Sequence, residues 1–122
     1  MPSNVIADKT KSFAIKTIKF CQQLNQEHCY VLANQILRSG TSIGANVRES
    51  KNAQSSLDFI NKLNIALKEA DETAYWLELL QESKVTSDIQ QIDVDALYSE
   101  LNEIISILIK IIKTTKQRVK NN

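Results

Sequence analysis

Apolar residues recur every three or four positions along most of this chain, which is the spacing of one face of an α-helix. Short polar segments separate four such stretches, and the only proline is at position 2, where it breaks no helix. Amphipathic helices joined by short connections are typical of an up-down-up-down bundle. We therefore predict an all-α protein, an antiparallel four-helix bundle in a single domain. Its helices are expected at about 4–24, 29–52, 56–83 and 93–118 of residues 1–122.

Sequence signals mark the beginnings of the last two predicted helices. Ser55 and Asp58 have the spacing of a capping box ahead of the third helix, and Asp93 is placed to cap the fourth. The buried stripe of the fourth helix is predicted to continue in steps of three and four residues. Its members are Leu97, Leu101, Ile104, Leu108 and Ile111.

Both glycines of the chain lie in the stretch RSGTSIGANVRES at residues 38–50. The apolar register of the preceding residues continues through this stretch, so we predict a helix rather than a loop. Gly40 and Gly44 share one face of that helix, where the missing side chains let a neighbouring backbone pack closely. A phosphate-binding loop is disfavoured because Gly44 is followed by Ala45 and Asn46 instead of lysine and a hydroxyl residue.

The third and fourth predicted helices carry more large apolar residues than one packed face needs. These residues form a second stripe beside the core positions. Contiguous exposed apolar patches typically mark an interface, so we predict self-association through this stripe. The alternative is a broad core seam with a few stray surface residues. The candidate oligomer interface comprises Ile65, Trp76, Leu79, Tyr98, Ile105, Ile109 and Ile112.

The charge of the chain is balanced, with a formal net charge of +1, but it is unevenly distributed. Residues 1–26 carry four lysines and one aspartate, whereas residues 27–109 carry thirteen acidic and six basic side chains. Residues 110–122 carry five basic side chains and no acidic one. In an up-down-up-down bundle the start of the first helix and the end of the fourth lie at the same end. The two basic segments should therefore form one basic pole.

The basic pole is the strongest candidate for a binding site. Contact with nucleic-acid phosphates is expected rather than base stacking, because no aromatic residues are interleaved with the basic ones. The alternative is that cations near the end of the fourth helix only interact with its dipole. Arg38 and Arg48 could contact phosphate too, or could pair with Glu69 or Glu72. The candidate phosphate ligands of the pole are Lys9, Lys16, Lys113, Lys116, Arg118 and Lys120.

Nothing in the sequence indicates a catalytic residue, a metal site or a cofactor. The single histidine, His28, lies in a predicted turn, and no nucleophile has a plausible base beside it. Cys21 and Cys29 are too few for a disulfide framework and are expected to be reduced. The most apolar stretch, 104–112, is nine residues long, whereas a membrane span needs about 20. We therefore expect a non-enzymatic cytoplasmic protein with no membrane partner.

Two stretches of the chain resemble a known family. They are YVLANQILRSGTSIGANVRES at 30–50 and DFINKLNIALKEADETAYWLELL at 58–80. Together they resemble the small bacterial four-helix-bundle proteins named after 23S rRNA intervening sequences. The resemblance implies an antiparallel bundle that assembles into a homopentameric ring in the bacterial cytoplasm, without catalytic activity. The family is also similar to the accessory protein of diversity-generating retroelements, whose basic barrel contacts nucleic acid and a reverse transcriptase.

Two hypotheses for function follow from these patterns. The leading one is a homo-oligomer, a pentamer by resemblance, that binds structured RNA or another nucleic acid through the basic pole. The alternative is an oligomeric adaptor that binds a partner protein and has no affinity for nucleic acid. Reversing the charge of Lys113 and Lys116 separates the two, because only the first hypothesis requires these lysines for binding.

Overall fold

The structure, a computed structural model, describes residues 2–121, with side chains from Val5 onward. Its four helices are α1 (Pro2–Gln26), α2 (Tyr30–Ser50), α3 (Ser56–Ser83) and α4 (Val94–Asn121). No strand occurs within the described residues. The prediction of an all-α fold with four helices is therefore confirmed, and α4 continues beyond its predicted end.

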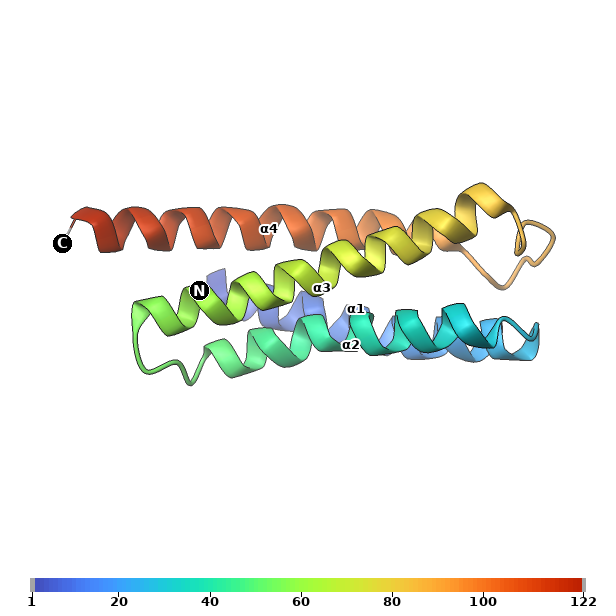
Figure 1. Ribbon diagram of the computed structural model, residues 1–122, viewed down its shortest axis with the longest axis horizontal. Coiled ribbons are helices and arrows are strands. Elements are labelled where there is room, and N and C mark those ends of the chain that lie inside the picture. Colours follow the sequence, from blue (N-terminus) through green and yellow to red (C-terminus); the bar gives the residue numbers. More distant parts are fainter. Residues whose placement is uncertain (1, 122) are drawn as a thin grey trace.

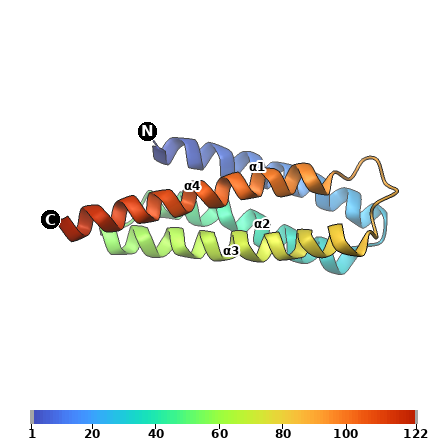
Figure 2. The same cartoon turned by 90° about the horizontal axis from the view of Figure 1, so that it is seen from above.

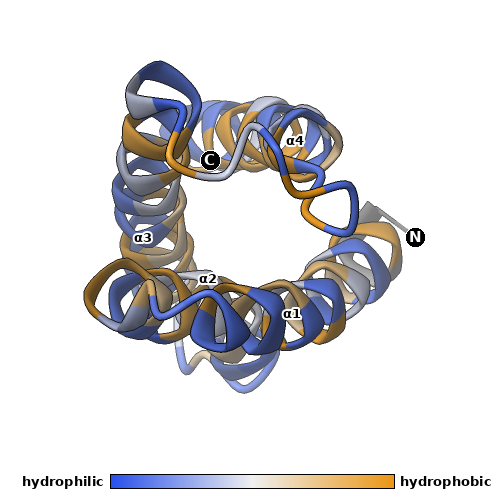
Figure 3. Ribbon diagram, turned by 90° about the vertical axis from the view of Figure 1, so that its right-hand side faces the viewer, coloured by the Kyte–Doolittle hydropathy of each residue, from blue (hydrophilic) through white to orange (hydrophobic). Residues whose placement is uncertain are grey.

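Consecutive helices run in opposite directions, and each helix packs beside the one that precedes it (Figure 1). α4 returns to the side of α1, and each helix contacts two neighbours around a common core (Figure 3). The contact between α2 and α3 is the most extensive, and that between α1 and α4 is the least. This topology places the first residues of α1 and the last residues of α4 at the same end of the bundle (Figure 2).

The connections between helices contain the capping contacts that the sequence signals. The Ser55 hydroxyl oxygen accepts a hydrogen bond from the Asp58 backbone N–H at 3.0 Å. The Asp58 carboxylate accepts in turn from the backbone N–H of Gln54 at 3.2 Å, one residue before the amide that a capping box uses. Asp93 accepts from the Ala96 N–H at 2.9 Å, so it caps the start of α4 as predicted.

The core is formed by apolar residues from all four helices, with Phe13, Ile36 and Leu101 among its fully buried side chains. Thr10 and Thr17 are buried among them. Each threonine hydroxyl donates to the carbonyl oxygen four residues earlier, at 2.8 Å and 2.7 Å respectively. Hydroxyl residues can therefore lie at a helix contact without leaving a buried polar group unpaired.

Near its C-terminal end, α4 buries a different isoleucine from the one that the predicted stripe contains. Ile112 is 6% exposed and belongs to the core, whereas Ile111 is only partly buried against it. At this level α4 lies beside Leu67 of α3, while its contact with α1 is the least extensive in the bundle. The side of α4 toward α3 is thus the better covered one. Ile112 is a core residue, and its assignment to an exposed interface was wrong.

Two glycines bring α1 and α2 into direct contact. Gly40 and Gly44 lie inside α2 and face α1. A methyl group on Gly40 would lie 2.8 Å from Cγ2 of Thr17, and one on Gly44 would lie 3.2 Å from the backbone oxygen of Thr10. The first distance is well below the optimal separation of about 3.5–4.0 Å between carbon atoms. The second is a tight carbon–oxygen contact. The missing side chains therefore allow the backbone of α1 to pack against α2.

Candidate nucleic-acid interface

The last turns of α4 project beyond the rest of the bundle. In Figure 1 this helix extends past the first turn of α1 and past the connection between α2 and α3. From residue 113 to residue 121 every side chain except that of Thr115 is exposed. We call residues 113–121 the projecting end of α4. It contains four of the predicted phosphate ligands, namely Lys113, Lys116, Arg118 and Lys120.

Three of these lysines border a groove between α3 and α4, which has a volume of about 430 Å³. Lys113, Lys116 and Lys120 are spaced three and four residues apart, which keeps them on one side of α4. None of the described residues that line the groove is acidic, so it presents positive charge beside an apolar floor. The other lining residues are Asn64, Leu67, Ile109, Ile112 and Gln117.

The predicted phosphate ligands of α1 are in a different setting. Lys9 forms an ion pair with Glu103 of α4, and Lys16 Nζ lies 2.9 Å from Oε1 of Glu100. These pairs join α1 to α4 and partly neutralise the two lysines. Within residues 2–121, the basic side chains of the projecting end form no such pair. The six predicted ligands therefore separate into two bridging lysines and four unpaired cations.

Arg118 lies on the side of α4 that faces away from the groove. It follows Lys116 by two residues, which at about 100° per residue places it about 200° around the helix. Its side chain is exposed. A ligand in the groove therefore contacts the three lysines first, and reaches Arg118 only if it wraps around the end of α4.

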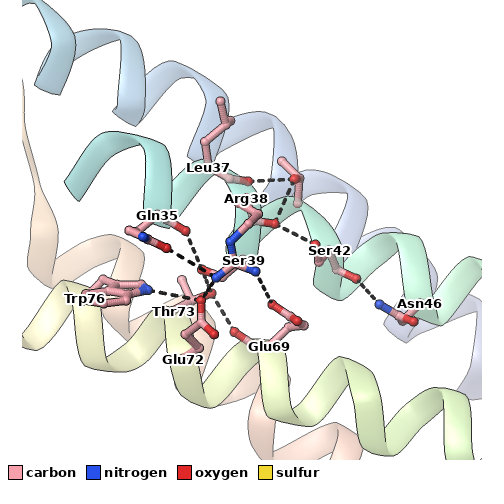
Figure 4. Close-up of polar contacts among 11 residues, drawn as sticks. Gln35, Leu37, Arg38, Ser39, Ser42, Asn46, Glu69, Glu72, Thr73 and Trp76 are labelled. Carbon is pink, nitrogen blue, oxygen red and sulfur yellow. Dashed lines mark hydrogen bonds and ion pairs between the residues drawn. The ribbon is translucent and has the colours of Figure 1, made fainter. Parts of the chain in front are cut away.

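A second charged cluster joins the outer sides of α2 and α3 (Figure 4). Arg38 forms an ion pair with Glu72 and another, at 3.5 Å, with Glu69. Glu72 also accepts a hydrogen bond from the indole N–H of Trp76 at 3.3 Å. Of the two alternatives for Arg38, the structure thus supports the ion pair with α3 over a free phosphate ligand.

The predicted interface residues differ in exposure. Ile65, Leu79 and Ile109 are 43%, 36% and 50% exposed. Trp76, Tyr98 and Ile105 are partly buried and pack against the core. Ile109 lines the lysine groove, whereas Ile65 and Leu79 do not. Of the predicted interface residues, Ile65 and Leu79 on α3 are therefore the exposed ones that lie outside the groove.

Three lining residues of the groove were not recognised in the sequence as site residues. The helical pattern places Leu67 in the core stripe of α3, and Asn64 and Gln117 resemble ordinary solvent-facing amides. They border one groove because α3 and α4 pack side by side in the bundle. No local sequence signal indicates which residues of the two helices lie at the same level.

Two ionisable groups outside the groove have altered acidity. Burial raises the pKa of the Cys21 thiol to about 12. Burial also raises the pKa of the Tyr98 phenol, as does nearby Glu78, which accepts its hydrogen bond at 3.2 Å. Both shifts favour the neutral group, whereas an activated nucleophile has a lowered pKa.

Other features of the described residues point to no competing site. No group of three or more histidine, cysteine, aspartate or glutamate residues within this part of the chain is placed to hold a metal ion. The ring of His28 lies in the turn after α1, with Nδ1 2.7 Å from the hydroxyl of Tyr30. Between residues 2 and 121, no helix has the combination of length and apolar character that crossing a bilayer requires. The groove beside the projecting end is the strongest candidate site.

Comparisons with known proteins agree with the fold. Residues 3–110 match the model of a family described as 23S rRNA-intervening sequence protein. The chain is also similar to a protein of unknown function from the S23 ribosomal protein family of Bacteroides thetaiotaomicron VPI-5482, known from its crystal structure. The sequences are 50% identical, with a TM-score of 0.83, and the match covers 93% of this chain and 99% of that one. No curated protein matches the sequence.

Proposed function

Because the chain belongs to the 23S rRNA-intervening sequence protein family, we propose that it is a non-enzymatic homo-oligomer of the bacterial cytoplasm that binds RNA or another nucleic acid. The site is the groove beside the projecting end of α4, where Lys113, Lys116 and Lys120 contact phosphates. Arg118 adds a further cation on the other side of the helix. The observation that carries the proposal is the groove, which is bordered by these three lysines and by no carboxylate of the described residues. The family match ends at residue 110, so the proposal rests on the groove itself.

The helix dipole does not account for the whole lysine cluster. Its effect falls off within the last turn of a helix. α4 ends at Asn121, so Lys113 lies more than two turns from the end. The helix dipole also gives no reason for the lysines to lie on one side of α4, whereas all three border the same groove. Phosphate binding explains both the extent and the grouping of the cations.

The proposal predicts affinity that depends steeply on salt. Fluorescence anisotropy of the purified protein against a labelled structured RNA should give a linear fall of log affinity with log salt, because bound phosphates release counterions. The variant Lys113→Glu/Lys116→Glu should bind about tenfold more weakly or worse, with a salt slope lower by about 2. The matched control is Lys9→Glu/Lys16→Glu, which reverses two lysines that already pair with α4.

Either of two results would contradict this assignment. One is unchanged affinity in the Lys113/Lys116 variant, and the other is an equal loss in the Lys9/Lys16 control. If the native protein binds no RNA or duplex DNA even at low salt, the alternative of an adaptor for a partner protein becomes the better proposal. A pulldown with the native protein then identifies the partner.

We also propose that copies of the chain associate through the exposed face of α3. Ile65 and Leu79 are large apolar residues that are 43% and 36% exposed. Association would remove them from water, which is favourable by about 25 cal/mol per Å² of apolar surface. A ring of five copies is the form that the family resemblance implies, and it would repeat the lysine groove around an axis. Repeated sites increase the total affinity for one long ligand.

The association predicts that Ile65→Asp/Leu79→Asp lowers the mass of the particle in solution. A buried, unpaired carboxylate opposes contact between copies, while in the single chain both positions already face solvent. Multi-angle light scattering should report the mass of one chain, with unchanged helical circular dichroism. Val85→Asp is the control, because Val85 is 57% exposed and lies outside the helices. An unchanged mass in the double variant would show that the interface lies elsewhere.

A further inference from the structure

The groove beside the projecting end contains more than phosphate ligands. Leu67, Ile109 and Ile112 form an apolar floor, and Ile109 is 50% exposed in spite of its size. A site that only neutralises phosphates needs no apolar surface, because phosphate contacts are made by cations and hydrogen-bond donors. The floor therefore calls for an apolar part of the ligand.

The two amide side chains of the groove add a second requirement. Asn64 from α3 and Gln117 from α4 both line it. A carboxamide carries a hydrogen-bond acceptor and two donors, so it can pair with the edge of a nucleobase. The groove thus combines a surface for a flat ring, groups for its edge, and cations for the phosphates on either side.

The lysines are arranged along one line. Lys113, Lys116 and Lys120 rise by about 4.5 Å and then about 6 Å along α4, at 1.5 Å per residue. They can therefore contact consecutive phosphates of one strand as it follows the helix. The volume of about 430 Å³ also lies within the range of about 300–1,000 Å³ that is usual for small-molecule sites.

We propose that the groove binds an unpaired nucleotide, with its base on the Leu67/Ile109/Ile112 floor and its neighbouring phosphates on the lysines. In a duplex the bases are stacked and their faces cannot reach such a floor, whereas loops, bulges and single strands expose them. The native protein therefore prefers single-stranded or looped nucleic acid to a continuous duplex. This inference rests on the proposed function and specifies the ligand of the same site.

The test compares two ligands and two variants. Anisotropy is measured with a fluorescein-labelled single-stranded RNA and with a duplex of the same length, and then with the corresponding DNA strands. Ile109→Ser should bind single strands about fivefold more weakly, because burial of its apolar surface is lost. Its affinity for the duplex should stay within about twofold. Val119→Ser is the control, since Val119 is 48% exposed on the same helix but does not line the groove.

The outcomes separate this inference from the proposed function. If Lys113→Glu/Lys116→Glu weakens binding but Ile109→Ser does not, phosphate binding stands and the base site is wrong. If neither variant changes affinity for any ligand, the proposed function fails as well. The mass of the Ile109→Ser particle is also measured by light scattering. A lower mass would show that copies of the chain cover the groove, which would overturn the base site. The inference is also overturned if Val119→Ser loses as much affinity as Ile109→Ser.

Discussion

Replacing Gly44 with valine is expected to lower the free energy of unfolding by about 3 kcal/mol, the upper part of the range for overpacked sites. The first added carbon would lie 3.2 Å from the backbone oxygen of Thr10, and valine adds two more carbons beyond it. That oxygen belongs to the helical backbone of α1, so it cannot rotate away as a side chain would. The whole of α1 has to move, which also disturbs the core that α1 covers.

Urea denaturation followed by circular dichroism measures this loss. The control is Ala45→Val, one position later, where the side chain is exposed and the added carbons meet water. It should lower stability by less than about 1 kcal/mol, which is the cost of replacing alanine by valine in an exposed helix position. Valine is a better helix former than glycine, so helix propensity opposes a loss at position 44. Equal losses at both positions would mean that the contact with α1 is not responsible.

Cys21 should react with a thiol reagent about a thousandfold more slowly in the folded protein than in urea. Its pKa rises from 9.0 to about 12 through burial, so the thiolate fraction near neutral pH falls by about three powers of ten. Alkylation is measured on a Cys29→Ser variant, so that only Cys21 reports. The matched Cys21→Ser variant reports on Cys29, which is partly exposed and should react faster. Similar rates for the two folded variants would contradict the burial of Cys21.

The same raised pKa makes the fold weaker in alkali. The thiol ionises at lower pH in the unfolded chain than in the folded one. The contribution of neutral Cys21 to the free energy of unfolding is therefore complete below pH 9.0 and is lost as the pH rises toward about 12. The raised pKa of Tyr98 acts in the same direction, above its ordinary value of 10.0. Urea midpoints across this range should fall more steeply for the native protein than for Cys21→Val/Tyr98→Phe.

Much of the fold could be predicted from the sequence because local and global requirements agree. The glycine-containing stretch is a clear example, since the apolar register on both sides of Gly40 is helical and the structure shows one helix through it. Caps at Ser55 and Asp93 depend only on residues within one turn. These features can be predicted without knowing which helices are neighbours in the bundle.

The site was harder to predict because it depends on how helices are placed relative to one another. Lys9 and Glu103 are 94 residues apart in the sequence, and their pairing follows from the register of α1 against α4. The pattern likewise favoured Ile111 over Ile112, because a stripe does not reveal that α3 covers α4 better than α1 does. The lysines were found from the distribution of charge along the chain and the expected bundle topology, but the groove that groups them was not.

The uneven closure of the bundle has a consequence for its motions. α1 packs closely on α2 at Gly40 and Gly44, whereas its contact with α4 is the least extensive and includes two exposed ion pairs. Exposed pairs are screened by salt, and regions with few buried contacts open first. We therefore expect the bundle to open first between α1 and α4, while α2 and α3 stay packed together.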